Sequence, residues 1–163
     1  MNESTVTRVL NAIGQVSNLY FKLVLIVAPS SRGKTRVLQD VAKEIKASLI
    51  NVNLELSLLM LDLTPQQRVL QLPQLFNEIV AKSTTDMVLL DNIELLFDTS
   101  LKLNPLALLK KVSRKRPIIS TWNGEVEDNH LKYAWQGHPE YNSYDLDDII
   151  VVDLAAAAAG EGG

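Results

Sequence analysis

The spacing of apolar residues changes repeatedly along the first third of the chain. Residues 5–19 place apolar side chains every three or four positions, which predicts an amphipathic helix. Residues 23–27 form an unbroken apolar run of strand length, typical of a strand buried on both faces of a parallel sheet. Helical spacing returns over residues 34–47, after a short loop, and residues 48–52 have the pattern of a second strand. This stretch therefore predicts the order helix, strand, loop, helix, strand.

The rest of the chain continues this alternation. Residues 54–63 are rich in leucine but follow no clean period, and no element is predicted there. The further predicted elements are a helix over about 65–82, a strand over 87–91, a helix over 104–113 and strands over 118–121 and 149–154. Strands that alternate with helices at this spacing predict an α/β domain with a mainly parallel sheet, because parallel neighbours need crossover connections.

Length and composition favour one globular domain. The chain has 163 residues, of which 47% are hydrophobic and 21% charged. We assign residues 1–154 to the domain and interpret the Ala- and Gly-rich residues 155–163 as a flexible tail or an expression scar. There are no cysteines, which excludes disulfide scaffolds and thiolate zinc sites, and there are only two histidines, which argues against a histidine-based metal site. No segment has the composition of a membrane span or signal peptide, so we expect a cytoplasmic protein without membrane association.

The loop after the first strand has the composition of a phosphate-binding loop. It precedes an amphipathic helix and ends in Gly-Lys-Thr, so that backbone N–H groups and the helix N-terminus can surround phosphate oxygens. Lys34 would reach the β- and γ-phosphates of ATP, and the Thr35 hydroxyl would bind Mg²⁺. Ala28 departs from the usual motif, which has glycine there. The candidate nucleotide-binding residues are Ala28, Pro29, Ser30, Ser31, Arg32, Gly33, Lys34, Thr35 and Arg36.

Two later strands end in candidate catalytic residues. Asp91 ends an apolar strand and is predicted to hold Mg²⁺ together with Thr35. Asn92 stands where many P-loop ATPases have a catalytic Glu, and Glu94 is either the general base or a solvated helix charge. Thr121 ends the fourth predicted strand, where it or Asn123 would touch the γ-phosphate; alternatively, Thr121 merely ends the strand and Asn123 begins a turn.

Charge is distributed unevenly along the chain. Residues 1–121 hold 15 basic and 10 acidic residues, a net +5, whereas residues 122–163 hold one basic and nine acidic residues, a net −8. Five cations cluster at the end of one predicted helix: Lys110, Lys111, Arg114, Lys115 and Arg116. They are interpreted as a solvated helix end, as contacts to DNA phosphates, or as a docking site for the acidic segment of a neighbouring subunit.

The acidic segment between the last two predicted strands is also rich in aromatic residues. We interpret it either as a loop and helix that cover the sheet edge or as aromatic anchors for a base or an interface. Its aromatic and histidine residues are His130, Tyr133, Trp135, His138, Tyr141 and Tyr144. The two histidines lack further obvious ligands, so neither is proposed as a metal ligand or a catalytic group.

Three segments together resemble the core of AAA-type ATPases: residues 28–35 (APSSRGKT), 86–97 (DMVLLDNIELLF) and 117–124 (PIISTWNG). More closely, residues 5–154 are similar to the BrxF family, small P-loop proteins of bacterial BREX phage-defence systems. The resemblance implies a P-loop NTPase with a five-stranded, mainly parallel sheet in the order 5-1-4-3-2, flanking helices and no C-terminal lid domain. It also implies an ATP-binding component that works beside other BREX defence proteins.

The sequence departs from the AAA pattern in two further ways, and each leads to an expectation. Without a lid, base and ribose contacts would come from around residues 16–21. Residues 122–148 contain no arginine, so an arginine finger would come from another protein or from a neighbouring copy, as Arg68, Arg114, Arg116 or Lys132. Hydrolysis by the isolated chain is then expected to be slow, because such a finger accelerates turnover by about 10³- to 10⁵-fold.

These observations predict a minimal ATPase that binds ATP and Mg²⁺, forms nucleotide-dependent homo-oligomers and hydrolyses ATP slowly. The alternative is a nucleotide-gated assembly or DNA-binding adaptor with little or no turnover, in which Asn92 marks a lost catalytic base.

Overall fold

The structure is a computed structural model that describes residues 2–29, 33–134, 142–146 and 148–154. Its core strands are β1 (Leu23–Ala28), β2 (Ser48–Asn51), β3 (Val88–Asp91), β4 (Ile118–Glu127) and β7 (Ile150–Asp153). The helix α1 (Asn2–Val16) precedes them, and α2 (Lys34–Ile45), α3 (Val52–Met60), α4 (Pro65–Ala81) and α5 (Pro105–Val112) lie between successive strands from β1 to β4. Two 3₁₀ turns, η1 (Glu94–Phe97) and η2 (Thr99–Leu101), and two short strands, β5 (His130–Tyr133) and β6 (Asn142–Asp145), complete the described elements.

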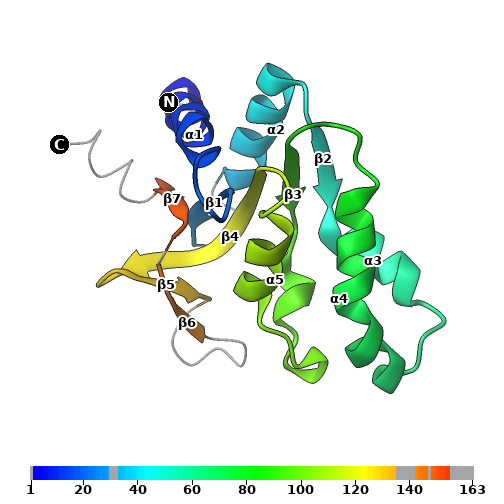
Figure 1. Ribbon diagram of the computed structural model, residues 1–163. Helices are drawn as coiled ribbons and strands as arrows, with labels where there is room; N and C mark the ends of the chain where they lie inside the picture. Colours follow the sequence, from blue (N-terminus) through cyan, green and yellow to red (C-terminus); the bar gives the residue numbers. More distant parts are fainter. Residues whose placement is uncertain (1, 30–32, 135–141, 147, 155–163) are drawn as a thin grey trace.

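The core strands form a parallel sheet in the order β2-β3-β4-β1-β7 (Figure 1). Every neighbouring pair in this order is parallel, so all five carboxyl ends lie at one edge of the sheet. The predicted order 5-1-4-3-2 and the α/β class are confirmed, since β7 is the fifth predicted strand. The fold is thus an α/β fold built on a parallel sheet.

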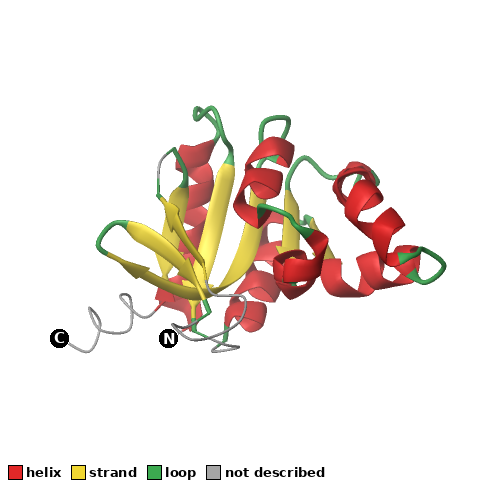
Figure 2. Ribbon diagram, turned by 90° about the horizontal axis from the view of Figure 1, so that it is seen from below, coloured by secondary structure: helices red, strands yellow, loops and turns green. Residues whose placement is uncertain are grey.

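Helices cover both faces of this sheet, which explains the continuous apolar run of β1 (Figure 2). Leu23, Leu25 and Val27 enter one core together with apolar residues of α3, α4 and α5. Val24 and Ile26 point to the other face and enter a second core with α1 and α2. All six residues of β1 are buried, as expected for a central strand between two layers of helices.

The sheet has seven strands rather than five, because β4 continues past Thr121 into an antiparallel hairpin. Residues Gly124–Glu127 pair with β5, and β5 pairs with β6. Asp128 and Asn129 both have positive φ, 52° and 60°, which a two-residue type I′ turn requires. The alternative of a turn at Asn123-Gly124 is therefore wrong, and the described part of the acidic segment is a hairpin instead of a loop and helix.

The hairpin is held to the domain by aromatic packing. Trp122 is fully buried and lies edge-on to Phe97, Tyr133 and Tyr144, and Phe97 stacks on Tyr133. The Trp122 indole N–H also donates to the carbonyl of Lys132 at 3.1 Å. The described aromatic residues of this segment thus form a structural cluster, while Trp135, His138 and Tyr141 lie outside the described residues.

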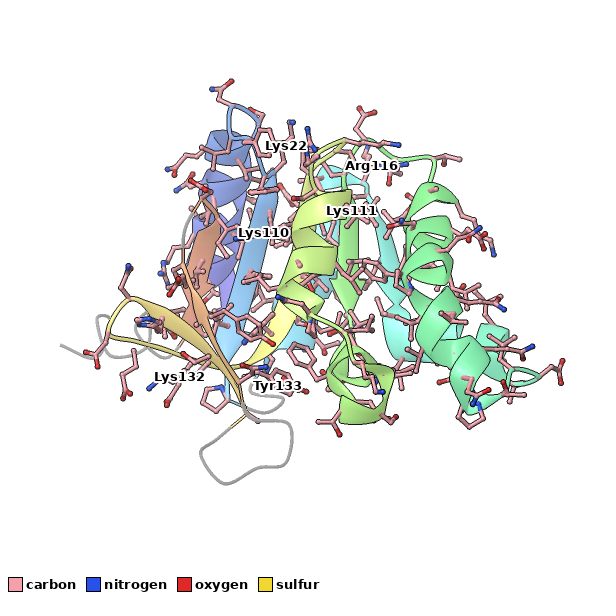
Figure 3. All side chains as sticks on the ribbon, turned by 60° about the horizontal axis from the view of Figure 1, so that its bottom comes forward. Lys22, Lys110, Lys111, Arg116, Lys132 and Tyr133 are labelled. Carbon is pink, nitrogen blue, oxygen red and sulfur yellow. The ribbon has the colours of Figure 1, made fainter. Side chains whose placement is uncertain are left out.

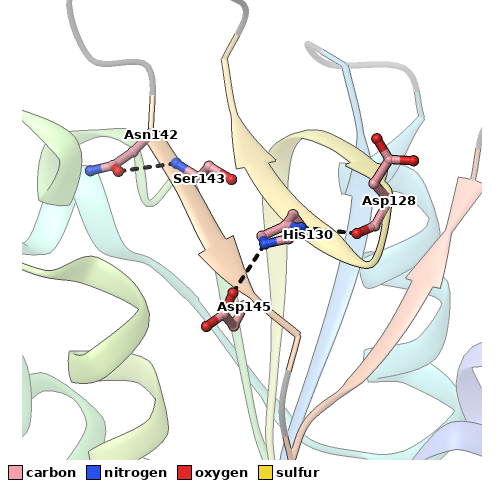
Figure 4. A network of polar contacts seen from close by, with 5 residues as sticks. All are labelled: Asp128, His130, Asn142, Ser143 and Asp145. Atoms are coloured by element: carbon pink, nitrogen blue, oxygen red, sulfur yellow. Dashed lines mark hydrogen bonds and ion pairs between the residues drawn. The ribbon is translucent and has the colours of Figure 1, made fainter.

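His130 connects parts of the hairpin to each other through its ring nitrogens (Figure 4). Its Nδ1 lies 2.9 Å from the Asp128 carbonyl, and its Nε2 lies 3.1 Å from Oδ1 of Asp145 on β6. These contacts join the turn to the outer strand and lie outside the group of polar residues at the carboxyl edge of the parallel sheet.

The leucine-rich segment that lacked a clean period contains α3. The Asn51 side chain accepts a hydrogen bond from the Leu54 N–H and so caps this helix. Leu54 and Leu58 are exposed, whereas Val52 and Leu56 are buried, so the surface leucines obscure the helical period. No described helix has both the length and the apolar character that crossing a bilayer demands.

Candidate functional site

The loop between β1 and α2 lies at the carboxyl edge of the sheet. Gly33 precedes α2 with φ of +78°, a left-handed conformation that other residues rarely adopt. Ala28 is the last residue of β1, and Pro29 follows it at the surface. Ser30, Ser31 and Arg32, which were also expected to bind nucleotide, lie outside the described residues. The described ends of the loop thus have the strand-to-helix geometry that the motif requires.

Lys34 begins α2 and turns its side chain back toward β1. Its ammonium group donates to the Ala28 carbonyl at 3.1 Å, and only 3% of the residue is exposed. Burial lowers the pKa of Lys34 to about 8, and the nearby negative charges of Glu94 and Asp91 oppose that shift. The ammonium therefore stays mostly charged at neutral pH and loses its charge more readily than an exposed lysine as the pH rises.

The Asp91 carboxylate is held by two threonine hydroxyls from neighbouring elements. Thr35 on α2 donates to Oδ2 at 2.8 Å, and Thr121 on β4 donates to Oδ1 at 2.8 Å. The backbone N–H of Asn92 also donates to Oδ1, at 2.9 Å. Asp91 is 8% exposed and Thr121 is 2% exposed, so this arrangement is shielded from water and has a fixed orientation.

Glu94, at the start of η1, is held by two asparagine amides. Asn53 Nδ2 donates to Oε1 at 3.2 Å, and Asn123 Nδ2 donates to Oε2 at 2.9 Å. Burial is the main cause that raises the pKa of Glu94, and the charge of Asp91 adds to it, while Lys34 and the Asn53 amide act in the opposite direction. A carboxylate with a raised pKa is a better proton acceptor near neutral pH.

Asn92 contributes its backbone to this site. Its φ of +54° turns the chain after β3, and its carbonyl accepts a hydrogen bond from the Asn53 N–H at 2.8 Å. The Asn53 side chain then accepts from the Leu95 N–H at 2.8 Å. These bonds connect the start of α3 to the turn that presents Glu94. The turn thus brings Glu94 beside Asp91, although three positions separate them in the sequence.

Arg36 and residues 16–21, which were expected to contact the nucleotide, take no part in the described polar contacts around Asp91 and Glu94. Arg36 is exposed on α2 and lies 3.9 Å from Asp40 one turn later. Residues 16–21 join α1 to the amino-terminal end of β1, whereas Ala28 and Lys34 lie at its carboxyl-terminal end. A strand of six residues is roughly 20 Å long. The expectation that residues 16–21 contact base and ribose is therefore wrong.

The described residues fit a magnesium ion held beside a nucleotide. The Thr35 hydroxyl and the Asp91 carboxylate supply the oxygen ligands that Mg²⁺ prefers, and they already lie next to each other. Within the described parts of the chain, no group of three His, Asp or Glu side chains could hold a metal alone. Phosphate oxygens and waters would have to complete the coordination, as is usual for Mg²⁺.

Sequence reasoning identified most of this group but missed Asn53. The structure brings together Lys34, Thr35, Asp91, Glu94 and Thr121 from α2, β3, η1 and β4. The missed signal was the position of Asn53, two residues beyond a strand of a parallel sheet, where ligand-contacting side chains gather. Asn123, proposed as a phosphate contact, instead hydrogen-bonds to Glu94.

Comparisons with known proteins show similarities of structure at low sequence identity. No protein-family model and no curated protein matches the chain. Three similar solved structures are a DNA replication initiation factor (14% identity, TM-score 0.49), C. elegans PCH-2 (14%, 0.44) and the replication initiator DnaA bound to AMPPCP and single-stranded DNA (17%, 0.43). These alignments cover 93%, 93% and 92% of this chain and 45%, 42% and 44% of the other chains. The chain thus spans less than half the length of each.

Proposed function

We propose that the protein is an ATPase that binds ATP with Mg²⁺ and hydrolyses it slowly. One observation carries this proposal: Asp91 is bonded to Thr35 of the phosphate-loop helix on one side and to Thr121 of β4 on the other. The buried carboxylate thus lies beside the hydroxyl of Thr35, which directly follows Gly33 and Lys34 in the sequence. Burying a carboxylate costs free energy that hydrogen bonds offset only in part, and buried charged groups gather at functional sites, which favours a binding role over a structural one.

The binding roles follow from these positions. The backbone around Gly33 and the start of α2 would surround the phosphates, and Lys34 would leave the Ala28 carbonyl to pair with them. Thr35 and Asp91 would hold Mg²⁺, which when bound neutralises charge on the β- and γ-phosphates. Thr121 keeps Asp91 oriented. Of the remaining expected contacts, Pro29, Ser30, Ser31, Arg32 and Arg36 stay part of the proposal.

Glu94 is proposed as the general base. In hydrolysis a water oxygen bonds to the γ-phosphorus, the bond to the bridging oxygen of ADP breaks, and one water proton passes to the Glu94 carboxylate. The Asn53 and Asn123 amides occupy one lone pair on each Glu94 oxygen, and each oxygen retains another to accept from water. Asn92 acts through its backbone, which turns the chain toward Glu94.

Slow turnover is supported by the bonds that the candidate finger cations already make. Arg116 donates to the Ser83 and Thr85 carbonyls, Arg68 donates to the Leu63 carbonyl, and Lys132 pairs with Glu127. A neighbouring copy that used one of these three side chains as an arginine finger would have to break such bonds first. We therefore propose that another protein, or Arg114 of a neighbouring copy, supplies the accelerating charge.

We also propose the setting in which this ATPase works. It would be the nucleotide-binding domain over residues 1–154, with residues 155–163 as a tail outside the described structure, in the bacterial cytoplasm beside other BREX defence proteins. Assembly into homo-oligomers would depend on ATP and Mg²⁺. Light scattering tests this point: the mass should rise on addition of ATP and Mg²⁺ and fall as phosphate is released, whereas an unchanged mass would exclude self-assembly.

Phosphate release under single-turnover conditions tests the ATPase directly. Glu94→Gln should lower the rate by about 100-fold or more while ATP still binds, because general-base catalysis contributes about 10²- to 10⁴-fold. Glu44→Gln, an exposed residue of α2, is the matched control and should keep the wild-type rate. Equal rates for Glu94→Gln and wild type would remove Glu94 from the reaction.

A second candidate is a nucleotide-gated adaptor without useful turnover. The observation that favours it is that both Glu94 oxygens already accept hydrogen bonds, which lowers the basicity of the carboxylate. The same experiment separates the two candidates. Tight ATP binding, with phosphate release that is equal in wild type and Glu94→Gln, would support the adaptor.

A further inference from the structure

We propose that a surface at the opposite edge of the sheet from the nucleotide site binds single-stranded nucleic acid. This surface, called here the Tyr20 surface, comprises Tyr20, Lys22, Lys110, Lys111, Arg114 and Lys115. It combines the loop between α1 and β1 with the end of α5 and the turn that follows it. The proposal goes beyond ATP hydrolysis and specifies the DNA contact that the basic cluster suggested.

The charges of the Tyr20 surface are not neutralised by neighbouring carboxylates. Among the described residues, none of its five cations lies within 4.0 Å of a carboxylate oxygen. Figure 3 shows Lys22, Lys110 and Lys111 around α5, whereas Lys132 lies at the far end of the sheet on the hairpin. The surface therefore concentrates positive charge in one place, which attracts a phosphate backbone.

Aromatic rings lie directly against these cations. The guanidinium of Arg114 lies 4.4 Å from the centroid of the Tyr20 ring, and Lys110 lies 5.3 Å from that of Phe21. Tyr20 remains 62% exposed, although Arg114 lies over its ring and Phe21 lies edge-on to it, with ring centroids 4.8 Å apart. A base can stack on the exposed ring or on the guanidinium plane, and such stacking tolerates any sequence.

Hydrogen bonds fix the two halves of the surface relative to each other. The Lys22 N–H donates to the Ser113 carbonyl at 3.0 Å, and the Lys22 carbonyl accepts from the Ile118 N–H at 2.8 Å. The Lys22 ammonium also donates to the Arg114 carbonyl at 3.2 Å. Because these bonds already order the backbone of both halves, little backbone conformational entropy is lost when a ligand binds.

A groove of about 490 Å³ continues this surface past the sheet edge. Lys22, Lys115 and Arg116 line it, together with one carboxylate, Asp86. Arg116 is anchored to the Ser83 and Thr85 carbonyls, so it contributes a fixed positive charge to the wall. A groove with several cations and a single acid suits a narrow polyanion, and the exposed Tyr20 beside it suits unpaired bases.

Unpaired bases distinguish this proposal from binding to duplex DNA. A duplex keeps its bases stacked on one another, so it would use the lysines and leave Tyr20 without a role. A single strand uses both kinds of side chain at once. The arrangement of Arg114 against Tyr20 therefore favours the single strand.

Fluorescence anisotropy with labelled oligo(dT) of about 20 nucleotides tests the proposal, with oligo(U) and a duplex of equal length as the other probes. Tyr20→Ala should weaken oligo(dT) binding by about 5- to 150-fold, and Tyr20→Phe should retain it, because the ring provides the stacking. Oligo(U) binding equal to oligo(dT) would identify any single strand as the ligand, and a preference would identify DNA or RNA.

A pair of charge reversals tests the phosphate contacts. Lys111→Glu with Lys115→Glu should weaken binding and reduce the slope of log affinity against log salt by about 0.7 for each phosphate that is no longer bound. Lys43→Glu with Lys46→Glu changes the net charge equally on the exposed end of α2 and should have little effect. Duplex binding as tight as oligo(dT) binding, equal binding by Tyr20→Ala, or no binding by wild type would each overturn the proposal.

ATP binding measured on the same preparations separates this proposal from the proposed function. The Tyr20 surface and Lys34 lie at opposite ends of β1, so the Tyr20 and lysine variants should bind ATP as wild type does. Loss of oligo(dT) binding with intact ATP binding would assign the effect to the Tyr20 surface alone.

Discussion

The Thr121 hydroxyl donates a hydrogen bond to Asp91 Oδ1 at 2.8 Å, across the gap between β4 and β3. The register explains this contact, because Leu90 of β3 pairs with Ser120 of β4 and the next residues along are Asp91 and Thr121. Thr35 holds the other oxygen of the same carboxylate. The parallel sheet thus fixes the orientation of Asp91 before any ligand arrives.

Removing the Thr121 hydroxyl should weaken the site without altering its shape. Thr121→Val leaves Asp91 with one buried donor fewer, and hydrogen bonds to charged groups contribute about 1.5–3 kcal/mol. We expect Mg²⁺-dependent ATP affinity to fall about tenfold or more and the free energy of unfolding to fall by about 1–3 kcal/mol. Titration calorimetry and urea unfolding measure the two effects. Thr99→Val, at an exposed position of η2, should change neither.

The two asparagines beside Glu94 should affect turnover more than binding. Asn53→Ala or Asn123→Ala removes one amide donor from the carboxylate and loosens its position. Because the Asn53 amide lowers the pKa of Glu94, its loss also raises that pKa further. We expect the rate of hydrolysis to fall about tenfold or more, with its acidic limb displaced to higher pH. A pH profile of single-turnover rates measures both. A slower rate without displacement of that limb would indicate that the asparagines act only on structure.

The affinity for ATP should depend on pH through Lys34. Burial lowers the pKa of Lys34 to about 8 in the free protein, and bound phosphates favour the charged ammonium and raise that pKa again. Affinity is therefore fully present below pH 8 and falls by up to about tenfold per pH unit above it. Titrations from pH 6.5 to 9.5 test this. Phosphate groups ionise near pH 6, so ATP itself does not titrate in this upper range.

The hairpin should depend on Gly124. A Cβ built on Gly124 would lie 1.7 Å from the Lys132 carbonyl oxygen, so Gly124→Ala must separate β4 from β5. We expect a loss of about 1–3 kcal/mol and a fall of several degrees in the melting temperature. Gly14→Ala is the matched control, since nothing lies within 4 Å of a Cβ there. It should stabilise α1 by about 0.5–1 kcal/mol. Equal melting temperatures for the two variants would contradict the packing described.

The pattern of apolar residues in the sequence predicted the strands of the parallel sheet but did not predict the hairpin. Strands such as β1 and β3 are buried on both faces, so their apolar runs are continuous and easily recognised. The outer part of β4 and β6 are exposed on at least one side and polar, with sequences such as Asn142–Asp145 (NSYD). Their pairing depends on positive φ at Asp128 and Asn129, a turn signal that no hydrophobic period accompanies.

The sequence predicted those residues of the candidate site that belong to motifs at the ends of strands. Lys34, Thr35 and Asp91 were identified in this way, and the register brings Thr121 to them. Asn53 could not be paired with Glu94 from the sequence, because their contact depends on the turn that the positive φ of Asn92 introduces. The backbone conformation of Asn92 thus determines the contact between Asn53 and Glu94, and the hydrophobic pattern carries no information about that conformation.

Titration calorimetry with ATP in the presence of Mg²⁺, on wild type and Lys34→Met, tests the central claim most directly. Wild type should bind one ATP per chain, and Lys34→Met should lose about 100-fold or more in affinity, because it removes a buried charge that pairs with phosphate. A thermal melt of the variant checks that it is folded, because the substitution also removes the hydrogen bond to the Ala28 carbonyl. Equal ATP affinity in the two proteins would contradict the account.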